Sequence, residues 1–189
     1  MNAMNDERDL WEAAWAPYDE QTYTAALGQI RPDDIVLDIG AGDLRLARRM
    51  VQVACRVIAW EIQPELLAGS MSAGNLVVVC ADARTEPVPA GVTVAVLLMR
   101  HCQHYGLYVE KLRAAGCRRL ITNARWGMDV EVVDLAPGSP FSTASVGWYA
   151  CRRCGAVGFN GDDAAQVSND SLNTVTDVEG CPCCTQFSL

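Results

Sequence analysis

The chain has 189 residues, of which 50% are hydrophobic and 20% are charged, and its formal net charge is −8. This length allows one domain of ordinary size plus a small appendage, and the composition excludes a disordered chain. No apolar run reaches the roughly 18 residues of a membrane-spanning helix, and the acidic N-terminus lacks the pattern of a secretory signal. We therefore expect a cytoplasmic protein with no membrane partner.

The chain begins with two helical patterns and then alternates short apolar runs with amphipathic stretches. The two first helices are expected over 6–16 and 20–30. The apolar runs predict strands at 35–39, 57–62, 75–81, 92–99 and 118–124, and the stretches between them predict helices at 44–54, 64–71 and 104–115. Because these strands are continuously apolar, they should be buried on both faces of a parallel sheet. The prediction is a doubly wound α/β fold that ends in an antiparallel hairpin of 130–135 and 143–150.

The segment VLDIGAGDLRLA (36–47) carries the most informative motif. A predicted strand runs through Gly40 and Gly42 directly into a helix, so the backbone turns tightly and can approach a ligand closely. A dinucleotide site generally has a third glycine, here replaced by Arg45, and its pyrophosphate would meet the repelling carboxylate of Asp43. S-adenosylmethionine has no phosphate, and Asp38 can act on its ammonium group.

Two further acids end the next two predicted strands. Glu61 closes the second strand, where a carboxylate can accept hydrogen bonds from both ribose hydroxyls. Asp82 follows the third strand and can accept a hydrogen bond from the adenine amino group. Because the carboxyl ends of parallel strands meet at one edge of a sheet, the acids and the glycine turn should form one site. The alternative is that these acids only cap the strand ends.

This set of residues resembles the class I S-adenosylmethionine-dependent methyltransferases, which have a Rossmann-like fold. DIGAG (38–42) is similar to their glycine motif, ADA (81–83) to their adenine-side acid, and PYDEQTY (17–23) to an N-terminal cap over the cofactor. The resemblance covers about residues 15–150. It implies S-adenosylmethionine as cofactor, bound by Tyr18, Tyr23, Asp38, Gly40, Gly42, Glu61, Ile62, Asp82, Ala83 and Met99. The sequence departs from the family at Leu44, where many members have a third small residue, and in lacking a helix between the fifth strand and the hairpin.

Methyl transfer would take place just beyond the fourth strand. The reaction is an in-line displacement, so the enzyme mainly aligns the reactants, and a base is needed only if the nucleophile carries a proton. Both histidines, His101 and His104, lie there, and one of them is the predicted base; equally, they can cap the helix or bond backbone carbonyls. Arg100 and Tyr105 are expected to shape the substrate pocket, and Cys102 is expected to be a structural thiol rather than a nucleophile.

Five of the nine cysteines lie in residues 151–189. Cys151 and Cys154 form one C-x2-C pair and Cys181 and Cys184 form another, and two such pairs supply the four thiolates of a zinc ribbon. A closed shell of four thiolates makes the zinc structural, because it leaves no open position. Cys183 can replace Cys184 as the fourth ligand. The same pairs can also form two disulfides or a redox pair, although a reducing compartment disfavours both.

These observations predict an N-terminal helical cap (1–30), a methyltransferase domain (31–147) and a four-cysteine module (148–189) that contains a polar loop over 160–176. The predicted function is an S-adenosylmethionine-dependent methyltransferase whose acceptor is unknown, a small molecule or a protein being favoured. Nucleic acid is less favoured because the module is acidic, and a protein partner can bind the ribbon. The alternatives are a non-catalytic module that binds the cofactor or a partner, and an RNA methyltransferase that docks through the ribbon.

Overall fold

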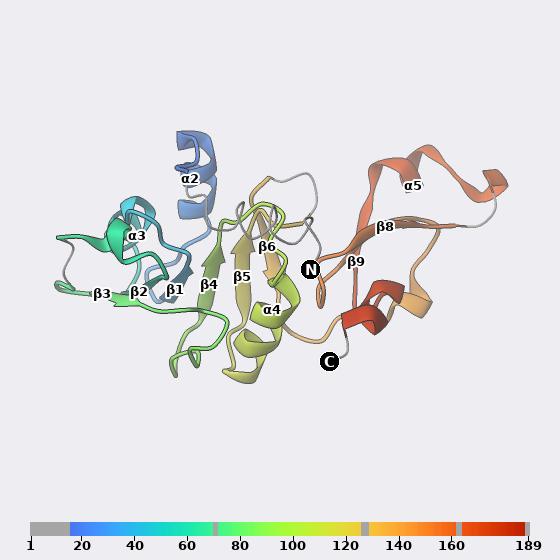
Figure 1. Cartoon of the computed structure of the whole chain (residues 1–189). Helices are drawn as coiled ribbons and strands as arrows, with labels where there is room; N and C mark the ends of the chain where they lie inside the picture. Colours follow the sequence, from blue (N-terminus) through green and yellow to red (C-terminus); the bar gives the residue numbers. More distant parts are fainter. Residues whose placement is uncertain (1–15, 70–71, 126–128, 162–163, 188–189) are drawn as a thin grey trace, which may run out of the picture.

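The chain forms two β-sheets that lie side by side in a computed structural model (Figure 1). The structure describes residues 16–69, 72–125, 129–161 and 164–187. The larger sheet has six strands in the order β3-β2-β1-β4-β5-β6, and the smaller sheet has three in the order β8-β7-β9. The helix predicted over 6–16 lies outside the described residues, apart from its last position.

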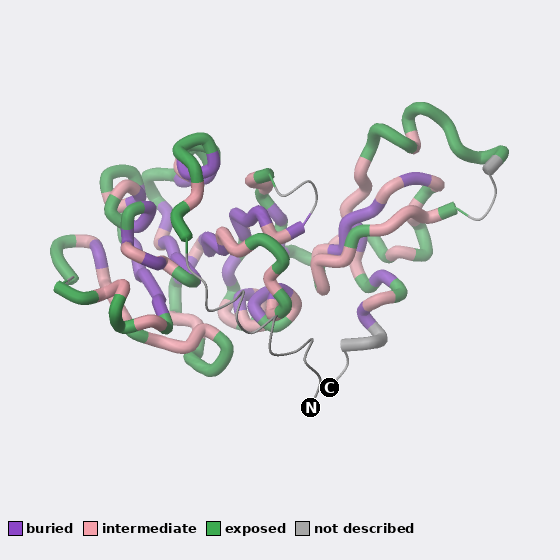
Figure 2. Tube along the Cα trace, turned by 45° about the horizontal axis from the view of Figure 1, so that its top comes forward, coloured by how far each residue is buried: buried purple, intermediate pink, exposed green. Residues whose placement is uncertain are grey.

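The larger sheet is mostly parallel, as predicted. Its parallel strands are β1 (Ile35–Ile39), β2 (Arg56–Glu61), β3 (Leu76–Cys80), β4 (Val94–Leu97) and β5 (Arg119–Thr122). The edge strand β6 (Glu131–Asp134) pairs with β5 in the antiparallel direction. The central strands β1 and β4 are buried on both faces, which explains why their sequences are apolar without alternation (Figure 2).

Helices cover both faces of this sheet and make the fold doubly wound. α2 (Glu20–Leu27) and α3 (Arg45–Met50) pack on one face, and α4 (Tyr105–Ala114) packs on the other. The side chain of Asp19 accepts a hydrogen bond from the Thr22 N–H and caps α2. Where the sequence predicted a helix over 64–71, the described residues, which end at 69, form a short 3-10 helix, η1 (Pro64–Leu67). Every helix among the described residues is too short or too polar to cross a bilayer.

The predicted hairpin of 130–135 and 143–150 is corrected by the strand pairing. The antiparallel pair at the sheet edge consists of β5 and β6, with Leu120 opposite Val133. Residues 147–151 form β7 (Gly147–Cys151), which belongs to the smaller sheet and lies between β8 (Val157–Asn160) and β9 (Val175–Val178). The reason is burial, because Tyr149 and Cys151 pack with Val178 in a core of the smaller sheet.

The segment 160–176, expected to be a polar loop, contains regular structure. It includes η4 (Ala164–Gln166), α5 (Asn169–Asn173) and the start of β9. The Ser168 side chain accepts from the Ser171 N–H, and the Ser171 side chain accepts from the Ser168 N–H, so the two serines form a capping box. A 3-10 helix, η3 (Phe141–Thr143), precedes β7, and η5 (Pro182–Phe187) follows β9.

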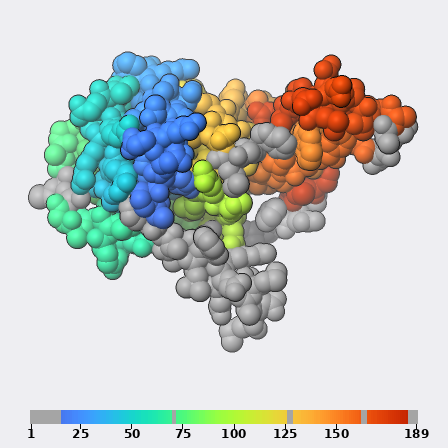
Figure 3. All heavy atoms as spheres, turned by 90° about the horizontal axis from the view of Figure 1, so that it is seen from above, coloured from blue at the N-terminus to red at the C-terminus, as the bar shows by residue number. Residues whose placement is uncertain are grey.

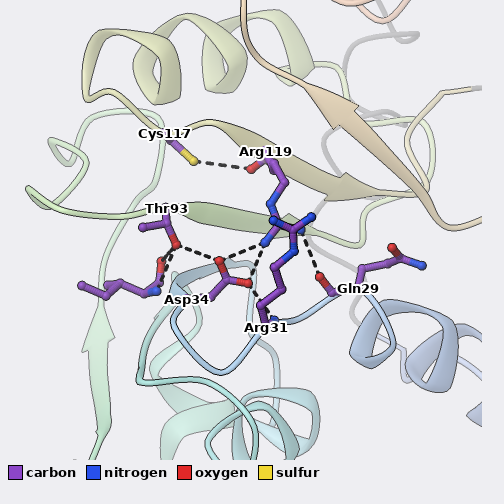
Figure 4. Close-up of polar contacts among 7 residues, drawn as sticks. Gln29, Arg31, Asp34, Thr93, Cys117 and Arg119 are labelled. Carbon is purple, nitrogen blue, oxygen red and sulfur yellow. Dashed lines mark hydrogen bonds and ion pairs between the residues drawn. The ribbon is translucent and has the colours of Figure 1, made fainter.

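A buried carboxylate connects the amino ends of β1, β4 and β5 (Figure 4). Asp34 accepts hydrogen bonds from Arg119 Nη2 at 2.7 and 2.9 Å, from the Thr93 hydroxyl at 2.9 Å and from the Arg31 N–H at 2.8 Å. Arg119 also donates to the Gln29 carbonyl at 3.1 Å. Burial acts to raise the pKa of Asp34, but these hydrogen bonds outweigh it and the pKa is lowered. We call this cluster the Asp34 network.

Ion pairs join the smaller sheet to the larger one. Arg125, after β5, is buried and pairs with Glu131 of β6 at 2.7 Å and with Asp177 of β9 at 3.0 Å. Arg113 of α4 makes two hydrogen bonds to Glu179, at 2.8 and 2.9 Å. The smaller sheet lies at one end of the molecule, and α2 and α3 lie at the opposite end (Figure 3).

Candidate functional site

The glycine turn after β1 is held by the neighbouring strand. The N–H groups of Gly40 and Ala41 both donate to the Trp60 carbonyl at 2.9 Å. Gly40 and Gly42 have φ values of 73° and 56°, which L side chains rarely adopt. Leu44 stands where many class I methyltransferases have a small residue. Its φ of 66° is unusual for a residue with a buried side chain, so the backbone is strained there. The turn therefore presents backbone rather than side chains at the carboxyl edge of the sheet.

Glu61 connects this turn to the end of β2. Its Oε2 accepts from the Gly42 N–H and its Oε1 accepts from the Gln63 N–H, both at 2.8 Å. Glu61 is buried, with 4% of its surface exposed. A carboxylate has about four acceptor positions, so two remain for ligand hydroxyls. Glu61 thus lies where the sequence predicted it and also supports the backbone of the turn.

Asp38 is buried beneath the same turn. Its Oδ2 has no hydrogen-bond partner among the described residues, and 4% of the residue is exposed. Burial, followed by the like charge of Glu61, raises the pKa of Asp38 to about 7. A buried acceptor without a donor is unfavourable unless a ligand supplies the donor. A cation beside Asp38 would satisfy this oxygen and restore its charge.

A cavity of about 450 Å³ opens at the carboxyl ends of β1 to β4. Its wall includes five of the predicted cofactor residues and one predicted base: Gly40, Ile62, Asp82, Ala83, Met99 and His104. A Cβ atom on Gly40 would come within 3.3 Å of the Met99 methyl carbon, so a side chain there would narrow the cavity. Asp38, Gly42 and Glu61 are not among the lining residues; they lie in and next to the glycine turn, which borders the cavity at Gly40.

Asp82 is partly exposed in this wall and pairs with Arg84. The Arg84 guanidinium lies 2.9 Å from Asp82 Oδ2, and the Arg84 N–H donates to Oδ1 at 2.9 Å. The hydrogen bond from Arg84 lowers the pKa of Asp82. The Lys111 ammonium donates to the Ala83 carbonyl, which ties α4 to this loop. Asp82 thus keeps its negative charge at neutral pH.

The two cap tyrosines lie beside the loop that follows β4. The Tyr18 N–H donates to the Tyr23 hydroxyl at 2.9 Å, and the Arg100 N–H donates to the Tyr18 hydroxyl at 3.1 Å. The Arg100 guanidinium carbon lies 5.2 Å from the centre of the Tyr18 ring. Tyr23 is buried in the core next to α3, and neither tyrosine is among the residues that line the cavity. Arg100 is exposed and also lies outside the cavity wall.

The two histidines differ in position. His104 lines the cavity and precedes α4, with its ring 6.3 Å from the ring of Tyr108. His101 is exposed, has φ 61° and is not in the cavity wall. Tyr105, predicted to shape the substrate pocket, is not among the residues that line this cavity and is buried against Gly155 of the four-cysteine module. Cys102 packs at the edge of the core around α4.

The four predicted metal ligands come together at the end of the smaller sheet. The sulfur atoms of Cys151, Cys154, Cys181 and Cys184 all lie within 4.8 Å of one another. The sulfur–sulfur distance is 3.6 Å between Cys151 and Cys184 and 3.5 Å between Cys154 and Cys181. Cys183 is not in this group, so Cys184 is the fourth member. Four thiols in this arrangement can hold a tetrahedral metal ion.

Sequence reasoning missed several residues near these sites. Trp60 and Tyr108 line the cavity, and Tyr108 lies four residues after His104, a helical spacing that the sequence displays. Asn123 follows β5 and is fully buried, and neither its amide oxygen nor its amide nitrogen has a hydrogen-bond partner among the described residues. A single asparagine after a strand gives no sequence signal.

No family model and no curated protein matches the sequence. Solved structures do match, and several of them are methyltransferases by name, while others are a [4+2]-cyclase and a precorrin 8W decarboxylase. The 23S rRNA methyltransferase ErmE is 27% identical, with a TM-score of 0.44 over 56% of this chain and 46% of its own. A dimethyladenosine transferase from Plasmodium falciparum is 19% identical, with a TM-score of 0.47 over 55% of this chain and 41% of its own. DhpI, in a complex with SAM and HEP, is 18% identical, with a TM-score of 0.44 over 60% of this chain and 58% of its own.

The matched region thus spans about half the length of these neighbours. At TM-scores below 0.5, the likenesses do not decide what this chain does. A shared fold also does not fix an activity, which depends on the site. The features of this chain that bear on its function are the strand order, the glycine turn with the buried Asp38 and Glu61, and the cavity beside that turn.

Proposed function

We propose that this chain is an S-adenosylmethionine-dependent methyltransferase that binds its cofactor in the cavity at the carboxyl ends of β1 to β4. The observation that carries the proposal is the buried Asp38 carboxylate, whose Oδ2 has no partner among the described residues and whose charge is disfavoured by burial and by Glu61. The ammonium group of S-adenosylmethionine would supply both the missing donor and the compensating charge.

The charges around the turn favour this cofactor over a dinucleotide. A pyrophosphate at the start of α3 would lie beside the buried carboxyl groups of Asp38 and Glu61, which would repel it, whereas Asp43 is paired with Arg45 at 2.6 Å. Arg84 lies in the cavity wall, but its positive charge is already paired with Asp82 and is not available to a phosphate. A sulfonium nucleoside carries no phosphate, so the same acids attract it.

Each strand end has a separate task in this proposal. Glu61 would accept hydrogen bonds from the ribose hydroxyls with its remaining acceptor positions, and Asp82 would accept from the adenine amino group. Ile62 and Met99 offer apolar contact in the cavity wall. The bound cofactor supplies an activated methyl group, and the chain's own task is to align an acceptor with it and to exclude water.

His104 is the proposed base for an acceptor that carries a proton. It lies in the cavity wall, whereas His101 is exposed and lies outside that wall. The acceptor is proposed at the level of class: a small molecule or a protein. The four-cysteine module (148–189) has five acidic side chains and two arginines, so its net charge disfavours the phosphate backbone of RNA.

We further propose that the four thiols hold zinc. Two C-x2-C pairs and a closed shell of sulfur ligands are typical of structural zinc. Zinc would hold together the small core of Tyr149, Cys151, Val178, Cys181 and Cys184, which is too small to be stable alone.

Calorimetry tests the cofactor class directly. S-adenosylhomocysteine and S-adenosylmethionine should bind and NAD should not, and Glu61→Gln should weaken binding without changing the preference. Asp33, an exposed acid before β1 that is not among the residues lining the cavity, gives the control Asp33→Asn. Binding of NAD in preference to S-adenosylhomocysteine would overturn the proposal.

Methyl transfer is tested with radiolabelled S-adenosylmethionine and separate small-molecule, protein and RNA fractions of a cell extract. Label should enter the small-molecule or protein fraction, and His104→Ala should reduce it far more than His101→Ala. Label confined to RNA would contradict the proposed acceptor class. Cofactor binding without transfer to any fraction would favour a non-catalytic binding module.

A further inference from the structure

The first turn of α4 packs directly on the loop that carries two of the four cysteines. Tyr105 is 2% exposed, and its hydroxyl donates to the Arg152 carbonyl at 3.5 Å. A Cβ atom on Gly155 would lie 2.8 Å from the Tyr105 ring, so the ring rests on the bare backbone of that glycine. A Cβ atom on Gly106 would lie 3.4 Å from the Arg153 carbonyl oxygen. The Cys151–Gly155 loop is therefore in close contact with the helix.

The same helix forms part of the cofactor cavity. His104 immediately precedes Tyr105, and Tyr108 follows one turn later, and both line the cavity. Their rings are in an edge-to-face contact, with centres 6.3 Å apart. Tyr105 thus touches the four-cysteine module while its neighbours on α4 touch the cavity.

Two ion pairs hold the rest of α4 to the module. Arg113 makes two hydrogen bonds with Glu179, which precedes Cys181 by two residues. Arg153 lies between Cys151 and Cys154 in the chain, and its Nη2 is 3.4 Å from Oε1 of Glu110. Both cysteine loops are therefore fastened to a single ten-residue helix. Of the two loops, the Cys151–Gly155 loop is the one that packs on the first turn of α4, next to the residues that line the cavity.

We propose that Tyr105 is a positioning residue through which metal binding at the four cysteines sets the affinity of the cavity for S-adenosylmethionine. This inference rests on the proposed function. The metal fixes the Cys151–Gly155 loop, the loop supports the Tyr105 ring, and the ring fixes the turn that places His104 and Tyr108 in the cavity wall. Coupling between two sites is reciprocal, so the cofactor also strengthens metal binding by the same factor.

The first experiment compares zinc-loaded and zinc-stripped protein. Zinc is removed with a chelator under reducing conditions, its content is measured by elemental analysis, and the dissociation constant of S-adenosylhomocysteine is measured by calorimetry. We expect removal of zinc to weaken binding about 5- to 150-fold, the usual range of coupling between sites, and expect added zinc to restore it. Reciprocally, saturating S-adenosylhomocysteine should slow the release of zinc to a chromogenic chelator.

Two glycine variants separate contact from backbone strain. Gly155 and Gly180 both lie in the module with positive φ, 76° and 71°. A Cβ on Gly155 meets the Tyr105 ring, whereas a Cβ on Gly180 meets nothing within 4 Å. Gly155→Ala should therefore weaken S-adenosylhomocysteine binding in zinc-loaded protein, and Gly180→Ala, with the same kind of strain, should leave it within about twofold of the wild type.

Tyrosine variants test the route itself. Tyr105→Leu should bind zinc but should lose the coupling, so that removal of zinc no longer changes the affinity for S-adenosylhomocysteine. Tyr105→Phe keeps the ring and should keep most of the coupling, because the hydroxyl contact is long. Loss of coupling is a readout that a purely structural defect would not produce, since such a defect weakens binding in both zinc states alike.

The outcomes are distinct. If S-adenosylhomocysteine fails to bind even the zinc-loaded wild type, the proposed function fails. If it binds equally well with and without zinc, the proposed function stands and the coupling is overturned. If zinc removal weakens binding equally in the wild type and in Tyr105→Leu, coupling exists but does not pass through Tyr105, and the role of this residue is overturned.

Discussion

Replacing Asp38 by asparagine should change how the stability of the protein depends on pH. The pKa of this carboxyl is raised from 3.8 to about 7, first by burial and second by Glu61. Between these two values the folded protein keeps a proton that the unfolded chain has lost. The free energy of unfolding therefore falls as the pH rises from about 4 to about 7. The amide side chain in Asp38→Asn does not titrate, so the variant lacks this loss.

The size of the effect follows from the two pKa values. One unit of pKa difference corresponds to about 1.4 kcal/mol, so the shift from 3.8 to about 7 amounts to about 4 kcal/mol. The stability of Asp38→Asn relative to the wild type should rise by about this amount between pH 4 and pH 8. Contributions from carboxyl groups that do not interact with Asp38 cancel in the comparison, because they are shared by both proteins.

The assay is urea denaturation of both proteins at several pH values from 4 to 8. A difference in the free energy of unfolding that stays constant within about 1 kcal/mol over this range would refute the reasoning. Cofactor binding gives an independent measurement. Near pH 6, binding of S-adenosylhomocysteine to the wild type should release a proton, detected by calorimetry in buffers of different ionisation enthalpy, and Asp38→Asn should bind more weakly without releasing one.

Three further changes have definite expected results. Cys184→Ser should abolish stoichiometric zinc binding while Cys183→Ser retains it, as measured by metal analysis, and equal loss in both would contradict the assigned fourth ligand. Asn123→Leu should raise the free energy of unfolding by about 1–3 kcal/mol, because it removes a buried amide without partners among the described residues; a decrease in urea denaturation would disprove this. Asp34→Ala should cost about 3–5 kcal/mol at pH 7, because it removes the buried carboxylate that pairs with the partly buried Arg119 and accepts from Thr93. Because the pKa of Asp34 is lowered, this loss should shrink as the pH falls below about 4, and the exposed Asp33→Ala is the control.

The central parallel strands were predictable because strands buried on both faces are continuously apolar in sequence. The edge strand β3 is equally apolar, but it is only partly buried, which corrects the expectation for that strand. Val36, Leu37 and the residues of β4 are apolar without alternation, and the structure buries all of them. The partner of β7 was not predictable from local sequence. Tyr149 and Cys151 fit a sheet edge as well as a metal-bound core, and only the positions of the distant cysteines decide between the two.

The α5 helix was harder to predict from the sequence than the strands. Its capping box, Ser168 with Ser171, is visible in the sequence, but the segment has no apolar periodicity, and a five-residue helix depends on its contacts with β7. The division of the chain at residues 30 and 147 stays a prediction.

The acids of the site were predictable by position, because carboxyl ends of parallel strands share one edge. Which neighbour on α4 faces the cavity was not predictable. His104 is the N-cap of α4 and Tyr105 is its first residue, and only the packing of α4 against the sheet decides which of the two lines the cavity. The lack of a partner for Asp38 Oδ2 among the described residues also needs coordinates, since it depends on every neighbouring donor.

The Asp34 network has a consequence for the order of folding events. β1, β2 and β3 lie within residues 35–80, whereas Asp34 is bonded to Thr93 and Arg119, which lie 59 and 85 residues further along the chain. These bonds can form only after the two halves of the sheet have joined. The network should therefore contribute little to the transition state, and its loss should speed unfolding while leaving the refolding rate nearly unchanged.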